Sequence, residues 1–189
     1  HRAGKNGIGS AHIEAIKWAY DKNYRKILTM DCDFTHSPDY INEFIKYSDD
    51  YDVVIGSRFL IKNNLRGWNL YRKIMTKVGH LLTIIFLDMP YDATGAYRLY
   101  RLDKIPSSFL NLIQSKNYSF FFESLHILHF NKISIGEIPI VLTSRVYGHS
   151  KMKIKDIFES VFYLFYIYIK KLFQSQKFLV LDEFDQTDT

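Results

Sequence analysis

Cysteine is almost absent from this chain of 189 residues, because Cys32 is the only one. A single cysteine excludes a disulfide framework and a zinc site built from cysteines. No segment has the pattern of a secretory signal, and we find neither an internal repeat nor a low-complexity segment. These absences lead us to expect a reducing, cytoplasmic setting.

Apolar runs long enough to cross a membrane are absent as well. The two most apolar stretches without a fixed charge, residues 78–87 and 160–169, hold about ten residues each, and roughly 20 are needed to span a bilayer. The second, SVFYLFYIYI followed by Lys170 and Lys171, is typical of a helix lying in the membrane interface, with tyrosines and lysines at the headgroups. A core helix covering a sheet is the alternative.

Strands and helices alternate along the sequence. Hydrophobic residues make up 47% of the chain, with 15 Phe and 14 Tyr, which is ample for one core. This alternation indicates an α/β layered fold with a mostly parallel sheet, and Pro139 indicates an edge strand or a bulge. The pattern predicts helices over residues 10–20, 69–87, 118–130 and 153–173, and two more that begin at Ser37 and at Asp103. It predicts strands over residues 26–30, 51–59 and 133–142, and one at the end of YDATGAYRLYRL.

The stretch DCD, Asp31 to Asp33, follows directly on the strand predicted over 26–30. In sheets of this type, ligands bind outside the carboxyl ends of the strands. Side chains alternate along a strand, so we expect Asp31 and Asp33 to point the same way and to face one hard cation. The alternative is that Asp33 caps a turn and Asp31 pairs with a lysine, because a DxD motif is short and common.

Two loops have the composition of anion-binding sites. In GKNGIG, residues 4–9, glycines would let backbone N–H groups approach a phosphate at a helix N-terminus. This loop is neither a Walker loop nor a GxGxxG motif, and a flexible helix start is the simpler explanation. In SRVYGHSK, Arg145 and Lys151 bracket a glycine and Ser150 adds a hydroxyl, which suits a clamp over a diphosphate. A basic surface loop is the alternative.

Other polar residues fit ordinary structural roles. Asp92 and Arg98, in YDATGAYRLY, fit a turn with a cross-strand ion pair. Glu123 is the one acid in SFFFESLHIL, and we expect it to be paired. His126 and His129 lack a carboxylate nearby in the sequence, so we expect packed histidines rather than a metal pair.

The net charge of +5 is unevenly distributed. Residues 58–77 contain six basic residues and no acid, whereas the chain ends in the acidic LDEFDQTDT. Concentrated positive charge indicates an anionic partner, namely phosphate groups, nucleic acid or an anionic membrane surface, and a solvated helix face is the alternative. The neighbouring Trp68 and Tyr71 favour a membrane surface. The six basic residues are Arg58, Lys62, Arg66, Arg72, Lys73 and Lys77.

Taken in order, several motifs closely resemble those of the dolichol-phosphate (polyprenyl-phosphate) mannosyltransferases, which are family-2 glycosyltransferases. The resemblance runs from about Arg2 to Lys155, and the combination of motifs is far more specific than any one of them. It implies the GT-A type nucleotide-sugar-binding fold, which is Rossmann-like, with a mostly parallel sheet flanked by helices. The matching segments are GKNGIGSAH, MDCDFTHSPDYINEFI, YDVVIGSRF, GWNLYRK, YDATGAYRLY, IGEIPI and SRVYGHSK.

The resemblance also implies an activity. Family members transfer mannose from GDP-mannose to the phosphate of a polyisoprenoid lipid, with inversion, using Mg²⁺ or Mn²⁺. On the matching positions, Asp31 and Asp33 would hold the metal on the donor diphosphate, and Thr35 would act on the metal through water.

Further site residues follow from the same resemblance. Arg58, Arg72 and Thr76 match positions that hold the acceptor phosphate. Donor phosphates would be bound by a second set of residues, namely Gly4, Lys5, Gly9, Arg145, Ser150 and Lys151. We expect the catalytic residues to be Asp33, Arg58, Arg72, Arg145 and Lys151.

Members of this family begin with a further strand, helix and strand that have no counterpart here, so we expect this chain to be a fragment. We expect residues 1–152 to form the catalytic domain, 153–173 an amphipathic helix and 174–189 an acidic tail. The alternatives are a polyprenyl-phosphate glucosyltransferase or another lipid-linked sugar transferase, and a truncated, noncatalytic module that binds nucleotide or membranes.

The expected partners are GDP-mannose, a polyisoprenoid phosphate lipid and a membrane surface, and small membrane-anchoring subunits are further candidates. Nucleic acid is not expected as a partner, because the basic residues accompany carboxylates in the inferred pocket. The enzyme would be peripheral, on the cytoplasmic face of the endoplasmic reticulum in a eukaryote or of the inner membrane in a bacterium.

Overall fold

The computed structural model describes residues 4, 6–62, 64–65, 67–143 and 153–180. Helices and strands alternate as the sequence predicts, with boundaries shifted by a few residues. In chain order the elements are α1 (Ile8–Asp21), β1 (Lys26–Thr29), the 3₁₀ helix η1 (Pro38–Tyr40), α2 (Ile41–Tyr47), β2 (Val53–Ser57), α3 (Leu70–Leu87), β3 (Arg98–Arg101), α4 (Phe109–Leu112), α5 (Phe120–Phe130), β4 (Ile135–Pro139), α6 (Ile154–Phe173) and the 3₁₀ helix η2 (Ser175–Phe178).

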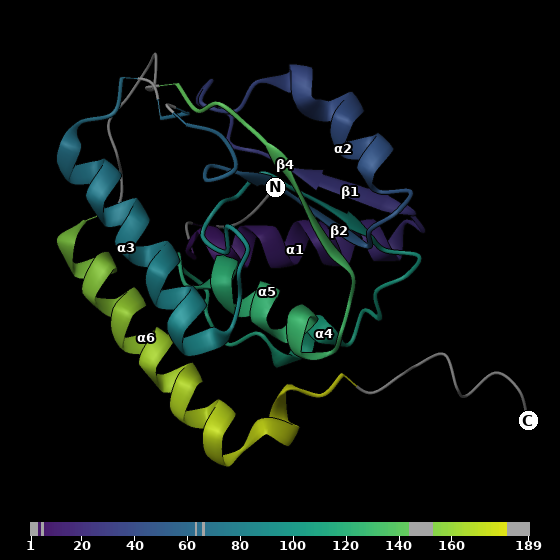
Figure 1. Ribbon diagram of the computed structural model, residues 1–189. Coiled ribbons are helices and arrows are strands. Elements are labelled where there is room, and N and C mark those ends of the chain that lie inside the picture. The colour runs from purple at the N-terminus through teal and green to yellow at the C-terminus, as the bar shows by residue number, and fades with distance from the viewer. Residues whose placement is uncertain (1–3, 5, 63, 66, 144–152, 181–189) are drawn as a thin grey trace, which may run out of the picture.

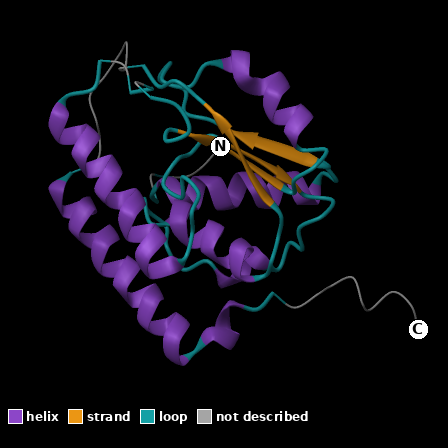
Figure 2. Ribbon diagram, in the orientation of Figure 1, coloured by secondary structure: helices purple, strands orange, loops and turns teal. Residues whose placement is uncertain are grey.

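The four strands form one mixed sheet in the order β1-β3-β2-β4. Strand β3 is antiparallel to both of its neighbours, and β2 is parallel to β4. Three strands therefore run in one direction and β3 alone is reversed, so the sheet is mixed, with two antiparallel pairs and one parallel pair. Strand β4, which contains Pro139, lies at an edge, as predicted (Figure 2).

The reversal of β3 follows from the position of α3. A crossover helix returns the chain to the edge of the sheet where the next parallel strand begins. Helix α3 instead runs along a flank of the domain beside α6 (Figure 1). The chain thus re-enters the sheet at the edge where β2 ended, and Arg98 at the start of β3 pairs with Thr29 and Ile55 near the ends of β1 and β2.

Two hydrophobic layers enclose the sheet. Val54 faces α2 and packs in a cluster with Phe44, while Val53 and Ile55 point to the opposite face and join the larger cluster. That larger cluster contains Ile16 of α1 and buried residues of α5 and α6. Figure 1 shows α2 on one side of the sheet and α1 with α5 on the other. Strand β2 is accordingly buried along its whole length, as its apolar run predicts.

Helix α6 has both a buried and an exposed face. Leu164 and Ile167 belong to the main core, and Phe178 beyond the helix is buried in the same cluster. The carboxamide of Asn131 donates to the Phe178 carbonyl at 2.6 Å and accepts the N–H of Val180 at 2.9 Å. The core therefore extends past the domain boundaries expected at 152 and 173. Residues 181–189 of the expected acidic tail lie outside the described residues.

The helix expected from Asp103 begins later, as the short α4. Pro106 explains the delay, because the residue before a proline is disfavoured in the helical conformation. The segment 102–104 instead forms a turn in which Arg25 and Arg101 pair with Asp103.

Helices α3 and α6 each carry an exposed apolar stripe with helical spacing. Phe162 is 72% exposed and Leu70 also 72%. We call these two stripes the α3–α6 apolar surface. No helix among the described residues has both the length and the apolar character needed to cross a bilayer. The surface consists of Leu70, Ile74, Val78, Leu81 and Ile85 on α3 and Ile154, Phe158, Phe162, Phe165, Tyr166, Ile169, Leu172 and Phe173 on α6.

Candidate active site

The carboxyl ends of β1, β2 and β4 and the beginning of β3 meet at one end of the sheet, which we call the strand edge. The register pairs Thr29 and Ile55 with Arg98, and Ser57 with Pro139. Asp31 follows β1 and Arg58 follows β2, so the fold delivers both side chains to this edge. Sheets of this class bind ligands at such an edge, and the predicted location of the site therefore agrees with the fold.

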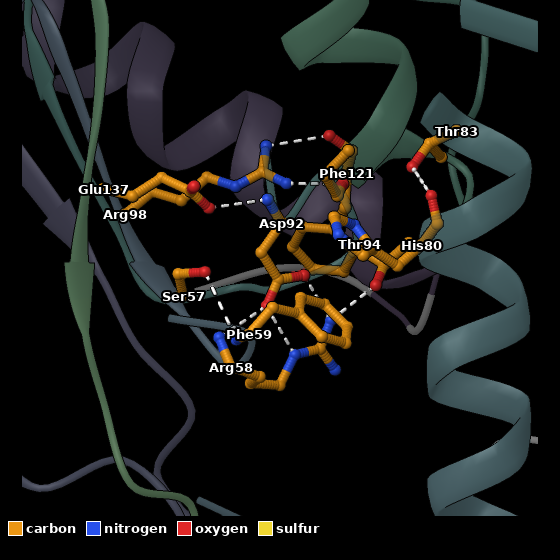
Figure 3. A network of polar contacts seen from close by, with 11 residues as sticks. Ser57, Arg58, Phe59, His80, Thr83, Asp92, Thr94, Arg98, Phe121 and Glu137 are labelled. Carbon is orange, nitrogen blue, oxygen red and sulfur yellow. Dashed lines mark hydrogen bonds and ion pairs between the residues drawn. The ribbon is translucent and has the colours of Figure 1, made fainter. Parts of the chain in front are cut away.

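Arg58 and Asp92 form a buried ion pair at this edge (Figure 3). Asp92 Oδ2 accepts the backbone N–H of Arg58 at 2.9 Å and the Nε–H at 2.7 Å, and Oδ1 accepts Nη2–H at 2.6 Å. Nη2 also donates to the hydroxyl of Thr94. The geometry is the two-point fork that arginine forms with carboxylates. It fixes the guanidinium in one orientation.

The charges of the pair stabilise one another. Burial lowers the pKa of Arg58, but Asp92 and then Asp31 outweigh this effect, so the pKa is raised. Burial raises the pKa of Asp92, but Arg58 outweighs it and the pKa falls below its ordinary value. Both groups are therefore charged near neutral pH. The first carboxylate of the DCD is therefore close enough to Arg58 to raise the pKa of the guanidinium.

The predicted ion pair between Asp92 and Arg98 is not formed, because Arg58 occupies the Asp92 carboxylate. Arg98 is fully buried and donates to the carbonyl of Ala93 at 2.7 Å and to that of Phe121 at 2.8 Å. Arg98 thus ties the loop that carries Asp92 to α5. It supports the site from the protein core and does not face the site itself.

Glu137 of β4 supports the same loop. Its Oε1 accepts the backbone N–H of Asp92 at 2.7 Å, and its carboxylate also accepts a hydrogen bond from Ser57. Burial raises the pKa of Glu137, and these two hydrogen bonds only partly offset the rise. One side chain from the edge strand therefore contacts both segments of the ion pair, through the Asp92 backbone and the Ser57 side chain.

The DCD stretch lies beyond the end of β1, in a bend, so the strand alternation assumed for Asp31 and Asp33 does not apply. Instead, Asp33 Oδ1 accepts the N–H of Thr35 at 3.2 Å and its hydroxyl at 2.6 Å. Asp33 thus caps a turn, which was the alternative prediction, while the other alternative, a lysine partner for Asp31, is not seen among the described residues. His36 Nδ1 accepts the N–H of Asp31 at 2.8 Å.

His36 is a site residue to which the sequence assigned no role. It is 6% exposed and packs against Tyr97. Burial lowers its pKa, although Asp31 raises it. A neutral ring can accept the Asp31 N–H, so His36 holds the backbone at the first of the two aspartates. Its only sequence signal is its place directly behind the DCD and before the Ser37 cap.

A divalent cation held by the DCD residues on a donor diphosphate stays a prediction. Mg²⁺ is commonly held by one or two carboxylates together with substrate phosphates, and Asp31 and Asp33 supply two such carboxylates. Among the residues that the structure describes, no group of three or more His, Cys, Asp or Glu side chains is placed to hold a metal. Thr35 is buried and bonds to Asp33, so in this geometry it orients a carboxylate.

Arg72, Thr76 and His80 follow one another at four-residue intervals and therefore share a face of α3. The ring of His80 stacks on Phe59, the neighbour of Arg58, with centroids 3.9 Å apart. Figure 3 shows His80 on α3 next to the ion pair. The guanidinium of Arg72 lies 3.9 Å from the ring centroid of Trp68. Arg72 and Thr76 thus share a helix face with His80, which contacts the neighbour of Arg58, and their role at the acceptor phosphate stays a prediction.

The glycine loop packs closely against the segment that leads into α5. Gly7 has φ 95°, and a Cβ there would lie 2.2 Å from the Lys116 carbonyl oxygen. A Cβ on Gly9 would lie 2.5 Å from Phe120, and the N–H of Ser10 donates to the Lys116 carbonyl at 3.0 Å. This close packing accounts for both glycines without a ligand. Phosphate binding by Gly4 and Gly9 stays a prediction.

Four predicted donor residues lie outside the described residues: Lys5, Arg145, Ser150 and Lys151. Other predictions concern residues remote from the edge. The Glu123 carboxylate accepts the N–H groups of Gln114 and Ser115 and the hydroxyl of Tyr163, so its partners are neutral. His126 and His129 pack against aromatic rings, as expected.

Two curated proteins are similar in sequence to this chain. One is the polyprenol monophosphomannose synthase of Mycolicibacterium smegmatis, 30% identical over 164 residues, which cover 86% of this chain and 62% of that protein. The other is the undecaprenyl-phosphate mannosyltransferase of Micrococcus luteus, 32% identical over 157 residues, covering 80% of this chain and 63% of that protein. The chain thus spans less than two thirds of the length of either relative.

Residues 1–121 match the sequence profile described as glycosyl transferase family 2. The mixed sheet, flanked by helices and carrying its polar site at the strand ends, is a glycosyltransferase domain of the GT-A fold class. The chain belongs to glycosyl transferase family 2.

Proposed function

We propose that this protein transfers mannose from GDP-mannose to dolichyl or polyprenyl phosphate with inversion, giving polyprenyl-phosphate mannose. The names of both relatives, a polyprenol monophosphomannose synthase and an undecaprenyl-phosphate mannosyltransferase, support this reaction. The observation that carries the proposal is the Arg58 guanidinium, which Asp92 holds in place at the strand ends that Asp31 also follows. An anion-binding group and a cation-binding group thus share one strand edge.

The chemistry of the acceptor suits this site. A phosphate monoester has a second pKa of about 6 and is mostly dianionic near neutral pH. Its oxygen can attack the anomeric carbon without a strong general base, which an alcohol acceptor would need. As the new bond forms, the bond to the diphosphate breaks on the opposite face of the sugar, and the electron pair leaves with the diphosphate. In-line attack of this kind inverts the anomeric centre.

Each side chain has a role in that reaction. Arg58, Arg72 and Thr76 would bind the acceptor phosphate and orient its oxygen toward the sugar. Asp31 and Asp33 would hold Mg²⁺ or Mn²⁺ on the donor diphosphate, with Asp33 oriented by Thr35. When bound, the cation supplies Lewis acidity to the leaving group. The assignments of Lys5, Arg145, Ser150 and Lys151 to the donor phosphates rest on the family resemblance.

The α3–α6 apolar surface supports a peripheral association with a membrane, where a lipid acceptor resides. Its Phe and Ile side chains would enter the interface, whereas Lys170, expected at the headgroups, lies over the Phe178 ring with Nζ 4.6 Å from the ring centroid. Arg72 and Thr76 lie on the same helix as one of the two stripes. We place the surface on the cytoplasmic leaflet, with small anchoring subunits as further candidate partners.

The test is an assay of the full-length protein in membrane vesicles with polyprenyl phosphate and a panel of radiolabelled GDP- and UDP-sugars. Label from GDP-mannose should enter the lipid fraction, and chelation of divalent ions should stop the transfer. Transfer from UDP-glucose alone would reject mannose and indicate a glucosyltransferase. Nucleotide or vesicle binding without transfer from any donor would indicate a noncatalytic module.

A further inference from the structure

His80 contacts both chain segments that form the Arg58–Asp92 ion pair. Its ring stacks on Phe59 at a centroid distance of 3.9 Å and an interplanar angle of 7°. It also forms a hydrogen bond with the backbone of Tyr91. Phe59 directly follows Arg58, and Tyr91 directly precedes Asp92. One imidazole thus touches the neighbour of each partner in the pair.

The same ring fixes the position of α3. His80 lies four and eight residues after Thr76 and Arg72, so the three side chains share one helical face. At 1.5 Å per residue, Arg72 is about 12 Å along the helix from His80. Farther along, α3 packs on α6 through Phe86 and buries Thr83 and Leu87, whereas its opposite side carries exposed apolar residues. The stack with Phe59 is a contact that joins α3 to the segment directly after β2, next to Arg58.

We infer that His80 is a positioning residue, which holds α3 against the Arg58–Asp92 pair so that Arg58, Arg72 and Thr76 form a single phosphate-binding site. The acceptor role of that site rests on the proposed function. The contact of His80 with the two segments of the ion pair does not depend on the proposed function. A misplacement of about 1 Å can reduce the efficiency of a site by roughly a hundredfold, so a link of this kind bears directly on acceptor binding.

The alternative role for His80 is packing alone. Its Nδ1 is buried and has no hydrogen-bond partner among the described residues, so a phenylalanine removes one unsatisfied polar atom together with the bond to Tyr91. His80→Phe retains an aromatic stack and loses the bond to Tyr91, whereas His80→Ala loses both. The two variants therefore separate the stack from the hydrogen bond.

Two control variants are available. Gly79→Ala alters the adjacent position, where an added Cβ meets nothing within 4 Å. His126→Phe replaces another buried histidine, which stacks on Phe178 away from the strand edge. A general loss of packing would affect His126→Phe as much as the variants of His80.

The first measurement is calorimetric titration of full-length protein with a short-chain polyprenyl phosphate and, separately, with GDP-mannose. We expect His80→Ala to weaken acceptor binding roughly tenfold, His80→Phe to weaken it by about threefold, and donor binding to change by less than about twofold. Both controls should match the parent protein. An equal loss for donor and acceptor, or unchanged acceptor binding in His80→Ala, would overturn the inference.

The second measurement is amide hydrogen exchange without any ligand. The N–H of Arg58 donates to Asp92, so it reports on the pair directly. In His80→Ala we expect this amide and those of 91–95 to exchange about tenfold faster, and in Gly79→Ala we expect no change. Unchanged exchange in His80→Ala would overturn the inference whatever the protein binds. A parent protein that binds no polyprenyl phosphate, yet shows faster exchange in His80→Ala, would refute the proposed function and leave the link established.

Discussion

The carboxylate of Asp92 accepts three hydrogen bonds from Arg58, one from its backbone N–H and two from its guanidinium. Asp92 is fully buried and the Arg58 side chain is 10% exposed. The pair joins the end of β2 to the loop before β3, two segments that are adjacent only in the folded protein. The position of a cationic group at the strand edge thus depends on one buried acid.

We expect Asp92→Asn to destabilise the protein by about 3 kcal/mol, because removal of one partner leaves the other charge buried without compensation. The free energy of unfolding in urea measures this loss. Glu159→Gln is the control, because it breaks an exposed pair with Lys155 on α6 and should cost at most about 0.5 kcal/mol. Equal effects of the two substitutions would show that Arg58 does not depend on Asp92.

Asp33→Ala should reduce transfer by about 100-fold or more and abolish metal-dependent donor binding, because the cation loses one of two anionic ligands. Transfer rates at ordinary magnesium concentrations, measured with the full-length protein, provide the test. Asp50→Ala, which removes an exposed acid after α2, should leave the rate unchanged. Retained activity in Asp33→Ala would remove this residue from the site.

Arg72→Ala should raise the KM for polyprenyl phosphate by roughly tenfold to a hundredfold, the range of one hydrogen bond to a charged group, with little change in the KM for GDP-mannose. Steady-state kinetics with each substrate varied in turn separates the two effects. Lys77→Ala is the matched control, because it removes an exposed positive charge on α3 that points away from the face of Arg72. An unchanged acceptor dependence in Arg72→Ala would contradict its assignment.

Phe162→Glu should weaken binding to anionic vesicles by at least about tenfold, because burying one Phe side chain contributes about 1.5–3 kcal/mol. Flotation of protein with vesicles measures the effect. Phe162 is 72% exposed, so thermal stability should stay close to that of the parent protein. Trp18→Glu removes an exposed aromatic residue from α1 and should bind as the parent does. Equal losses in both variants would mean that α6 is not the membrane-facing element.

His126 predicts a pH dependence of stability. Burial lowers its pKa to about 4, against an unfolded value of about 6.5. Between these values the unfolded chain binds a proton that the folded protein does not, so stability falls as the pH falls, by about 1.4 kcal/mol per pH unit. His126→Phe should remove the contribution of His126 to this pH dependence, which is measured as the free energy of unfolding in urea from pH 7.5 to 4.5. Burial also lowers the pKa of His12 to about 4, so the slope should decrease rather than vanish.

Local signals in the sequence predicted the elements well. Ser37 accepts the N–H of Asp39 at the start of η1, and Asn69 accepts that of Arg72 at the start of α3. Both caps are fixed by residues two or three positions apart, so they can be recognised without the fold. The location of the DCD at a strand end was predicted for the same reason.

The partners within the site could not be read from the sequence. Arg58 and Asp92 are 34 residues apart, and the sequence pattern favoured Arg98, which is nearer, as the partner. The Phe59–His80 stack and the hydrogen bonds of Glu137 likewise form only once β2, α3 and β4 are assembled. The reversed direction of β3 could not be predicted from the sequence, because a helix that runs along a flank and one that crosses the sheet have the same apolar periodicity.

The hydrogen bonds of Asn131 with the backbone of Phe178 and Val180 have a consequence for how the domain would meet a lipid substrate. They join the segment after α6 to the end of α5, so α6 is tied to the core beyond its far end as well as through Leu164 and Ile167. On the proposed function, the orientation of α6 on a bilayer would also orient the strand ends, and the architecture of the domain would set the depth at which the lipid phosphate is met.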